Sequence, residues 1–415
     1  MRRLRVFSLR WILTAIVGFY GVAPLAAAEA PPLLLDAAPV PAALASAHAR
    51  SEISGRIDLA ALAGARFALT LPDGASLVAR RERVERRDDD DWSWFGRVEG
   101  EGGGQVRLAV RRGSVAGVAY GERAVYEIAP EGSGRHRVSE LDFATFAACA
   151  GAIAPTTTAV EAVREAPLAD PFDEIDVLVL FTPQALAAAG GLAEVRAVAQ
   201  AAVDAANTAW TNSQVVPRMH LVHSGAVAHA DDGSMGNDLS WLANDASVAW
   251  LRDAVGADMV SLLVAGGGAC GIGYVQRNPG PGFASSAFQV TALGCAVGNL
   301  SFAHEFGHNQ GCEHNPENSS AWPNSGSYPW SFGHWYSANY RTVMSYSNPC
   351  TGGCTRHPYF SNSNVEFQGE PTGILDEREN YRTLNSTAQF VSNFRLHVDL
   401  VFVDDFESGG TADWN

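Results

Sequence analysis

The feature that most constrains this chain is a group of histidines in residues 301–315, SFAHEFGHNQGCEHN. His304 and His308 are four residues apart, so on a helix both imidazoles point from the same face and can reach one metal ion. Glu305 lies about 100° around the helix from His304, beside such an ion and not on it. That is the place for a base that activates a water molecule.

His314 tests this interpretation. In a continuous helix it would lie about 15 Å along the axis from His304, whereas a zinc–nitrogen bond is about 2.1 Å long. Gly311 can adopt the left-handed conformation that ends a helix, so we expect the chain to turn back there. The turn would complete a Zn2+ site of three histidines with one open position, as in catalytic zinc sites. A polar surface helix and a structural zinc site are the alternatives.

The pattern HExxHxxGxxH resembles the long motif of the metzincin zinc proteases, which is followed by a methionine turn. Met344, in RTVMSYSNP, has a suitable position for that turn. The resemblance implies a zinc endopeptidase with five site residues. They are the metal ligands His304, His308 and His314 and the catalytic residues Glu305 and Tyr346.

The resemblance also implies a role for each catalytic residue. Glu305 would be the general base that takes a proton from the attacking water and passes it to the leaving amine. Tyr346 would ligate zinc or stabilise the oxyanion, with a buried core tyrosine as the alternative. Substrate in this family lies antiparallel to an edge strand before the active-site helix, and SAFQVTALG is the expected edge strand.

HEFGHNQGCEHN and PYFSNSNVEFQGEPTG are most similar to bacterial reprolysin-like enzymes, including the peptidyl-Asp metalloendopeptidases. Reprolysins usually carry Asp after the third histidine, where this chain has Asn315. If the peptidyl-Asp resemblance holds, a cation should recognise an acidic side chain beyond the scissile bond. Arg341 and Arg356 are the candidates, and ordinary surface arginines are the alternative.

The 415 residues suggest several domains. Strands that alternate with helices indicate an α/β (α+β) metzincin-like catalytic domain with a mixed sheet and an active-site helix. Short alternating runs between residues 52 and 147 predict a small antiparallel β-rich prodomain, with an irregular lead-in at 30–51 and an exposed linker at 150–172. The predicted divisions are a signal peptide (1–28), a propeptide with its linker (29–165), the zinc metalloprotease domain (173–396) and a C-terminal tail (397–415).

The N-terminus predicts a secreted, extracellular protein. Four arginines precede an apolar run from Trp11 to about Ala23, and AAA before Glu29 is a plausible cleavage site. An uncleaved membrane anchor is the alternative. The net charge of −16 argues against nucleic acid or a membrane surface as a partner once the signal is removed. We therefore expect a protein or peptide substrate, and the sequence leaves the oligomeric state open.

Six cysteines in an exported chain suggest disulfides. We expect Cys270 to pair with Cys295, and two of the last three cysteines to pair with each other. Cys149 ends the predicted prodomain, and some metzincin zymogens place a propeptide thiolate on zinc. A latency switch at Cys149 is therefore one interpretation, and a buried apolar thiol or a disulfide partner is another.

Two other functions remain open. The first is a secreted binding or adhesion protein with a metzincin-like fold and no proteolytic activity, although such a protein would not need Glu305. The second is a zinc hydrolase with a non-peptide substrate. His220, His223 and His229 are expected to be structural, because the first two point to opposite faces of a strand.

Overall fold

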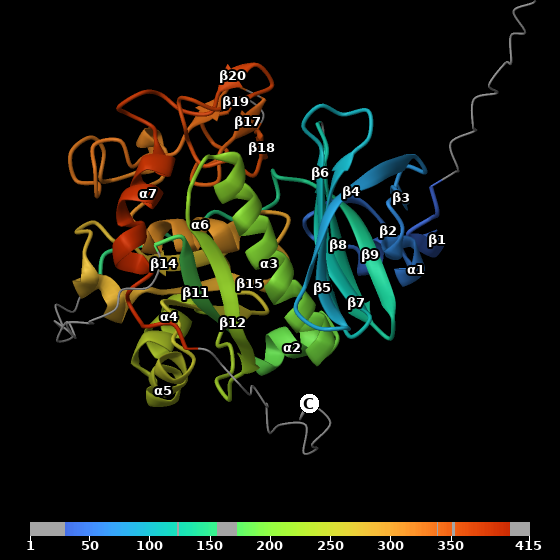
Figure 1. Ribbon diagram of the computed structural model, residues 1–415, viewed down its shortest axis with the longest axis horizontal. Coiled ribbons are helices and arrows are strands. Elements are labelled where there is room, and N and C mark those ends of the chain that lie inside the picture. The colour runs from blue at the N-terminus through green and yellow to red at the C-terminus, as the bar shows by residue number, and fades with distance from the viewer. Residues whose placement is uncertain (1–29, 123, 156–171, 338, 351–352, 399–415) are drawn as a thin grey trace, which may run out of the picture.

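The computed structural model describes residues 30–122, 124–155, 172–337, 339–350 and 353–398. Figure 1 shows two sheets on either side of a long helix, α3 (Leu192–Asn212). The predicted signal peptide, most of the predicted linker and the tail beyond residue 398 lie outside the described residues.

The N-terminal region is one antiparallel sheet of nine strands, so the predicted antiparallel β-rich region is confirmed. One face buries an apolar core around Phe67, Trp94 and Leu108. The prediction of an irregular lead-in at 30–51 was wrong, because Leu33 and Leu34 are buried in this core and the chain pairs there. In spatial order the strands are β1 (Leu34–Pro39), β2 (Ala49–Ile57), β9 (Arg135–Leu141), β8 (Val125–Gly132), β7 (Ser114–Tyr120), β6 (Gln105–Arg111), β5 (Asp91–Val98), β4 (Ser76–Arg86) and β3 (Arg66–Thr70), with the short helices η1 (Ala42–Leu44) and α1 (Leu59–Ala63) between them.

The second sheet is mixed, as expected. Four of its strands, β11, β12, β13 and β15, run parallel, and β14 runs antiparallel to β15. In spatial order the strands are β10 (Ala152–Ile153), β14 (Gly271–Tyr274), β15 (Phe288–Ala292), β13 (Met259–Val264), β11 (Glu174–Phe181) and β12 (Arg218–Ala226). The helices of this part are α2 (Pro183–Ala189), α3, α4 (Met235–Asn244), α5 (Ala246–Ala254), α6 (Ser301–Asn309) and α7 (Asn380–Val391), with the 3-10 turns η2 (Pro281–Ser286) and η3 (Leu293–Cys295).

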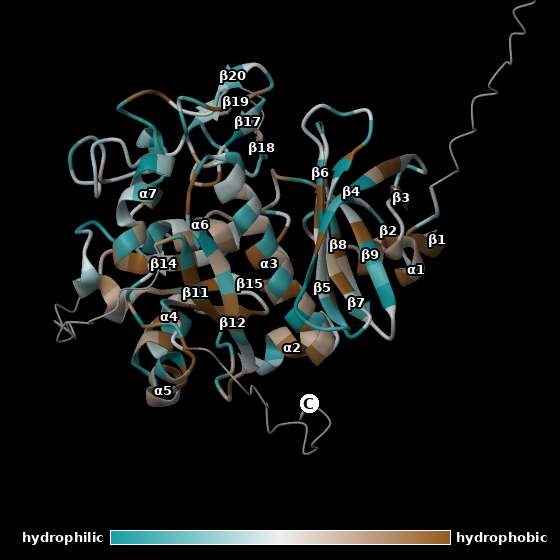
Figure 2. Ribbon diagram, viewed as in Figure 1, coloured by the Kyte–Doolittle hydropathy of each residue, from teal (hydrophilic) through white to brown (hydrophobic). Residues whose placement is uncertain are grey.

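Both faces of this sheet are covered by helices, which explains the unbroken apolar run in β11. Val177 and Val179 face the core formed with α3 and α6, whereas Leu178 and Leu180 face the core formed with α4. Figure 2 shows hydrophobic residues along β11 and β12. The sheet therefore supports α6, the helix that carries the histidine motif, on one face only.

The expected edge strand was wrong. SAFQVTALG contains β15, which lies between β13 and β14, so the edge on that side is β14. That edge is covered by β10, which runs parallel to β14. Residues 152–153 belong to the segment predicted to be an exposed linker, so the beginning of that linker instead joins the second sheet.

Helix α3 is buried on all sides because the N-terminal sheet covers one face and the mixed sheet the other. Polar residues recur at every fourth position, at Arg196, Gln200, Asp204 and Thr208, and all four are nearly inaccessible. Polar bonds cross to the N-terminal sheet from this stripe and from the end of the helix. They join Ser93 Oγ to Asp204 (2.6 Å), Arg107 Nε to Thr208 (2.9 Å) and Gln105 to Asn212 (3.0 Å).

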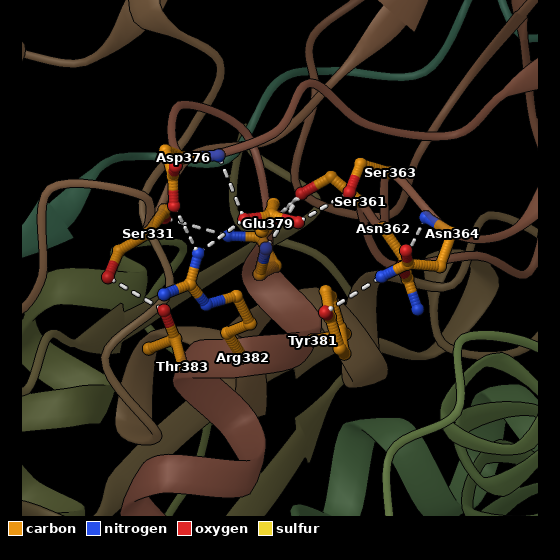
Figure 3. Close-up of polar contacts among 11 residues, drawn as sticks. Ser331, Ser361, Asn362, Ser363, Asn364, Asp376, Glu379, Tyr381, Arg382 and Thr383 are labelled. Carbon is orange, nitrogen blue, oxygen red and sulfur yellow. Dashed lines mark hydrogen bonds and ion pairs between the residues drawn. The ribbon is translucent and has the colours of Figure 1, made fainter.

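The described residues between 310 and 380 form little regular structure, and buried polar bonds at the start of α7 hold them in place (Figure 3). The buried carboxylate of Glu379 accepts hydrogen bonds from Ser363 and Arg382, both 2.6 Å, and Ser331 lies 2.7 Å from Thr383. The carbonyl of Ser331 accepts from the amide of Glu313, so this network reaches the motif itself. The short elements here are η4 (Pro316–Asn318), β16 (Trp335–Tyr336), β17 (Tyr340–Arg341), β18 (Thr355–Arg356), β19 (Glu366–Phe367) and β20 (Glu370–Pro371).

The disulfide expectation is confirmed. Cys270 is bonded to Cys295, and Cys350 is bonded to Cys354. Cys149 and Cys312 are unpaired thiols. No single helix among the described residues is long and apolar enough to cross a bilayer, and only α2 and α3 together, bent by 94°, pass that test.

Candidate metal centre and active site

The histidines of the motif converge on one point. We call His304, His308 and His314 the α6 cluster, since two lie on α6 and the third follows it. The Nε2 atom of His314 lies 3.2 Å from that of His304 and 3.0 Å from that of His308. All three rings are at most 5% exposed. Three nitrogens bound at about 2.1 Å to one tetrahedral ion would lie slightly more than 3 Å apart, so this geometry fits a single ion.

The turn that brings His314 back occurs where the sequence suggested. Helix α6 ends at Asn309, and Gly311 has a φ of +92°. A Cβ atom at Gly311 would lie 2.6 Å from Ser327 Oγ and 3.0 Å from the carbonyl of Gln276. Both the left-handed backbone and the lack of space therefore require glycine at this position.

Two of the imidazoles are oriented by backbone carbonyls. Nδ1 of His304 lies 2.8 Å from the carbonyl of Val343, and Nδ1 of His308 lies 2.7 Å from that of Cys312. If Nδ1 carries the proton and donates it, the Nε2 lone pairs face the shared point, as metal-bound imidazoles require. Burial lowers the pKa of His308 to about 4 and lowers those of His304 and His314 well below their usual range, so the neutral form is favoured at pH 7.

Glu305 is fully buried beside the α6 cluster. Burial raises the pKa of its carboxyl to about 8, and among the described residues its Oε1 has no hydrogen-bond partner. Strand β14 passes directly over it, because Cβ atoms at Gly271 and Gly273 would lie only 2.6 Å and 3.3 Å from its carboxylate oxygens. The two glycines leave Glu305 next to the cluster without a side chain in between.

Residues 148–153 lie across this site. The carbonyl of Ala148 accepts from the amide of Cys270 (3.3 Å), and the amide of Ala150 donates to Gly271 (2.9 Å). Cys149 Sγ lies 3.5 Å from Glu305 Oε2 and 4.0 Å from His308 Nε2. Its sulfur and the ligand nitrogens of the three histidines all lie within 4.8 Å of one another. The thiol therefore occupies the side of the cluster that would otherwise remain open.

This geometry agrees with comparisons to known proteins. Residues 173–361 match Reprolysin_5, described as metallo-peptidase family M12. This part of the chain is an M12 metallopeptidase domain. Proteins named peptidyl-Asp metalloendopeptidase are 28% identical to it in Xanthomonas campestris pv. campestris (82% of this chain, 85% of the relative) and in Stenotrophomonas maltophilia (the same shares). One in Pseudomonas aeruginosa is 33% identical over 53% of this chain and 40% of its own length.

The chain that carries this domain is thus a metalloendopeptidase, a hydrolase whose substrates are proteins or peptides. These comparisons give no support to the alternatives of a non-catalytic binding protein or of a hydrolase with a non-peptide substrate. They imply a metal ion, for which the α6 cluster is the buried candidate among the described residues.

Two residues of the predicted methionine turn lie at the site of this metallopeptidase. Met344 is fully buried and packs against α6, where a Cβ at Gly307 would lie 2.6 Å from its sulfur. The ring centroid of Tyr346 lies 4.4 Å from that of His314, and its hydroxyl donates to the carbonyl of Cys149 (3.1 Å). The turn is fixed by Asn315, whose Oδ1 accepts from the amide of Tyr346 (3.0 Å).

The two candidate arginines have different surroundings. Arg341 is buried in its own loop and donates to the carbonyls of Ser345 (2.7 Å) and Cys354 (3.3 Å). Arg356 is also buried and donates to the carbonyl of Asn299 (2.8 Å), but among the described residues its Nε has no partner. Neither is an ordinary surface arginine, and Arg356 retains hydrogen-bonding capacity near Glu305, whose charge acts on it.

Sequence reasoning missed three contributors to the site. Gly271 and Gly273 were not singled out, although alternate glycines in a short strand, CGIGY, signal a close approach of backbone to another group. Asn315 was noted only as a departure from the reprolysin pattern.

His229 lies away from the active site, where it is 2.8 Å from Asp238 and stacks on Trp241.

Proposed function

We propose that this metallopeptidase is a secreted, zinc-dependent endopeptidase made as a zymogen, in which residues 29 to about 165 form a removable propeptide. The catalytic part rests on one observation: three imidazole nitrogens meet beside the buried carboxylate of Glu305. Zinc is the metal we favour, because three neutral imidazoles suit it and leave one position open. Secretion rests on the first 28 residues and fits a chain with two disulfides.

Zinc at the α6 cluster would lower the pKa of a water molecule in the open position and polarise a peptide carbonyl. Glu305 accepts the proton of the attacking water and then delivers it to the departing amine. The low-polarity surroundings that raise its pKa in the metal-free protein suit a group that must hold and then release a proton. The hydroxyl of Tyr346, beside His314, donates a hydrogen bond to the developing oxyanion.

Strand β14 is the proposed substrate-binding edge. The amides of Cys270 and Val275 and the carbonyl of Gly271 now bond to residues 148–153. An extended substrate would use the same groups by strand addition once this segment has left. Because the segment runs parallel to β14, it lies in the opposite direction to an antiparallel substrate. We infer that this direction protects it from cleavage by the site that it covers.

Part of the contact between α3 and the N-terminal sheet is polar, which supports a removable propeptide, while Ala116 and Val118 of β7 share an apolar core with α3. A permanent core contact would be mainly apolar, whereas contacts that must separate are more polar. The face of α3 that meets the sheet carries the stripe Arg196, Gln200, Asp204 and Thr208. After removal of the sheet the polar groups of these four side chains could exchange protein partners for water.

The relatives named peptidyl-Asp metalloendopeptidase suggest a preference for Asp beyond the scissile bond. Arg356 is the residue we propose to recognise it, because a buried guanidinium with an unpartnered Nε can donate to a carboxylate. Its hydrogen bond to Asn299 fixes the group in place near Glu305.

The decisive experiment measures zinc content and peptide cleavage for the mature enzyme and for Glu305→Gln. The variant should retain its metal and lose activity by about 1,000-fold, a typical contribution of a general base. Glu317→Gln, at a partly exposed carboxylate in η4 that follows the motif, is the control and should remain active. Undiminished cleavage by Glu305→Gln would reject Glu305 as the base.

Two further measurements test the latency role of Cys149 and the Asp preference assigned to Arg356. Cys149→Ser should raise the activity of the uncut chain, whereas Cys312→Ser should not, and equal latency in all three proteins would reject a role for Cys149. For substrate choice, peptides that differ only in Asp or Leu after the scissile bond should be cleaved at different rates. Arg356→Met should abolish that difference, and equal cleavage of both peptides by the wild type would remove the Asp proposal.

A further inference from the structure

A second group of metal-binding residue types lies outside the active site. We call Glu174, Asp176, His220 and His397 the terminal cluster, because they join the first residues of β11 and β12 to the segment after α7. Asp176 and His220 are directly paired in the parallel register of β11 and β12. His397 comes from more than 170 residues further along the chain.

The imidazoles approach one carboxylate from two sides. Nδ1 of His220 lies 3.1 Å from Oδ1 of Asp176, and Nδ1 of His397 lies 2.6 Å from Oδ2. Oε1 of Glu174 lies 3.7 Å from Nδ1 of His220. One ligand atom from each of the four residues lies within 4.8 Å of the others. Two nitrogens and two carboxylates therefore surround one small volume.

The backbone that carries these ligands is fixed from behind. Asp258 is buried, and its carboxylate accepts from the amide of Asp176 (2.9 Å) and from the amide of Arg395 (3.1 Å). The last segment also passes so close to Gly256 that a Cβ there would lie 2.4 Å from the carbonyl of Leu396. Asp258 thus places Asp176 and the segment of His397 relative to each other, whereas the exposed side chains of His220 and Glu174 can adjust around an ion.

We propose that the terminal cluster is a second metal site, one that binds Zn2+ or another divalent ion that favours imidazole and fastens residues 392–398 to β11 and β12. The ligand set selects the ion: two imidazoles with carboxylates suit zinc, copper or nickel, whereas calcium and magnesium favour sites made of oxygen alone. The site is structural, since its ligands lie on other elements than Glu305 and Tyr346. It goes beyond the proposed function and does not depend on it.

The test is to count zinc in the purified chain. Wild type equilibrated with zinc in excess and then desalted should hold two equivalents, and His220→Asn and His397→Asn should each hold one. His223→Asn, on the same strand, is the matched control and should hold two. In a His314→Asn background, which removes the α6 cluster, one equivalent should remain and should be lost on adding His220→Asn.

Peptide cleavage by His220→Asn and His397→Asn reports that these variants are folded and should stay within about twofold of wild type, as is usual for surface substitutions away from a site. Hydrogen exchange gives the second expected result. Zinc should slow exchange at residues 392–398 in the wild type and should not do so in His220→Asn or His397→Asn. Bound zinc that does not decrease on adding His220→Asn or His397→Asn, in the wild type and in the His314→Asn background alike, would overturn the proposal. The zinc counts of the terminal variants do not depend on whether Glu305 acts as the general base in peptide hydrolysis.

Discussion

The two histidine clusters, the α6 cluster and the terminal cluster, are built in opposite ways. The α6 cluster is buried, contains no carboxylate and obtains its order from a helix, a glycine turn and backbone carbonyls. The terminal cluster is partly exposed, is built around the carboxylate of Asp176 and joins three distant parts of the chain. Burial keeps the imidazoles of the α6 cluster neutral, whereas the hydrogen bond to Asp176 favours the protonated form of His220, which a metal ion would have to displace.

The largest expected difference concerns catalysis. His314→Asn should lose bound zinc and lower kcat/KM by about 1,000-fold or more, because no other described residue replaces that nitrogen beside Glu305. His397→Asn should leave kcat/KM unchanged, since the terminal cluster lies on other elements. Steady-state cleavage of one peptide by both purified variants measures this, and similar losses in both would erase the distinction.

The same contrast explains which features of the site and the fold could be predicted from the sequence and which could not. The α6 cluster was predictable because its ligands lie within eleven residues, and helix geometry with one glycine determines their positions. The terminal cluster was not, since the pairing of β11 with β12 and the path after α7 depend on the whole fold, and His220 was expected only to be structural. The mixed sheet followed from strand and helix patterns, but which strand lies at the edge did not. SAFQVTALG reads as a strand in either position.

Acid should destabilise the metal-free protein through the α6 cluster. Burial lowers the pKa of His308 from 6.5 to about 4, so the folded state binds fewer protons than the unfolded chain. Stability is therefore lost as the pH falls below 6.5, by about 2 kcal/mol between pH 7 and pH 5 for this one residue. Thermal unfolding in the presence of a chelator measures it, and His308→Asn should show a shallower dependence. Parallel curves would contradict the role of burial.

An effect of comparable size is expected at the turn that brings His314 to the α6 cluster. Gly311→Ala places a Cβ against Ser327 and Gln276 in a left-handed conformation, which should cost about 1–3 kcal/mol of stability and weaken zinc binding. Gly236→Ala, on α4, meets no atom within 4 Å and is the control, which should not lose stability and can gain up to about 1 kcal/mol. Chemical unfolding with and without zinc compares the two. Equal stability would mean that the turn tolerates a side chain.

The smallest expected effect has the opposite sign to that of acid on the α6 cluster. The hydrogen bond to Asp176 raises the pKa of His220 above 6.5, so the metal-free pair stabilises the fold below that pH and loses this contribution as the pH rises through the raised pKa. Half of the His220 side chain is exposed, and solvent screening limits the contribution to about 0.5 kcal/mol. Wild type should therefore lose slightly more stability than His220→Asn between pH 6 and pH 8 in the presence of a chelator. With zinc in place of the chelator, wild type should lose less stability than His220→Asn between pH 6 and pH 8. The reason is that an ion requires neutral imidazoles and therefore binds better at pH 8. Curves that stay parallel under both conditions would show that Asp176 and His220 are neighbours without a measurable interaction.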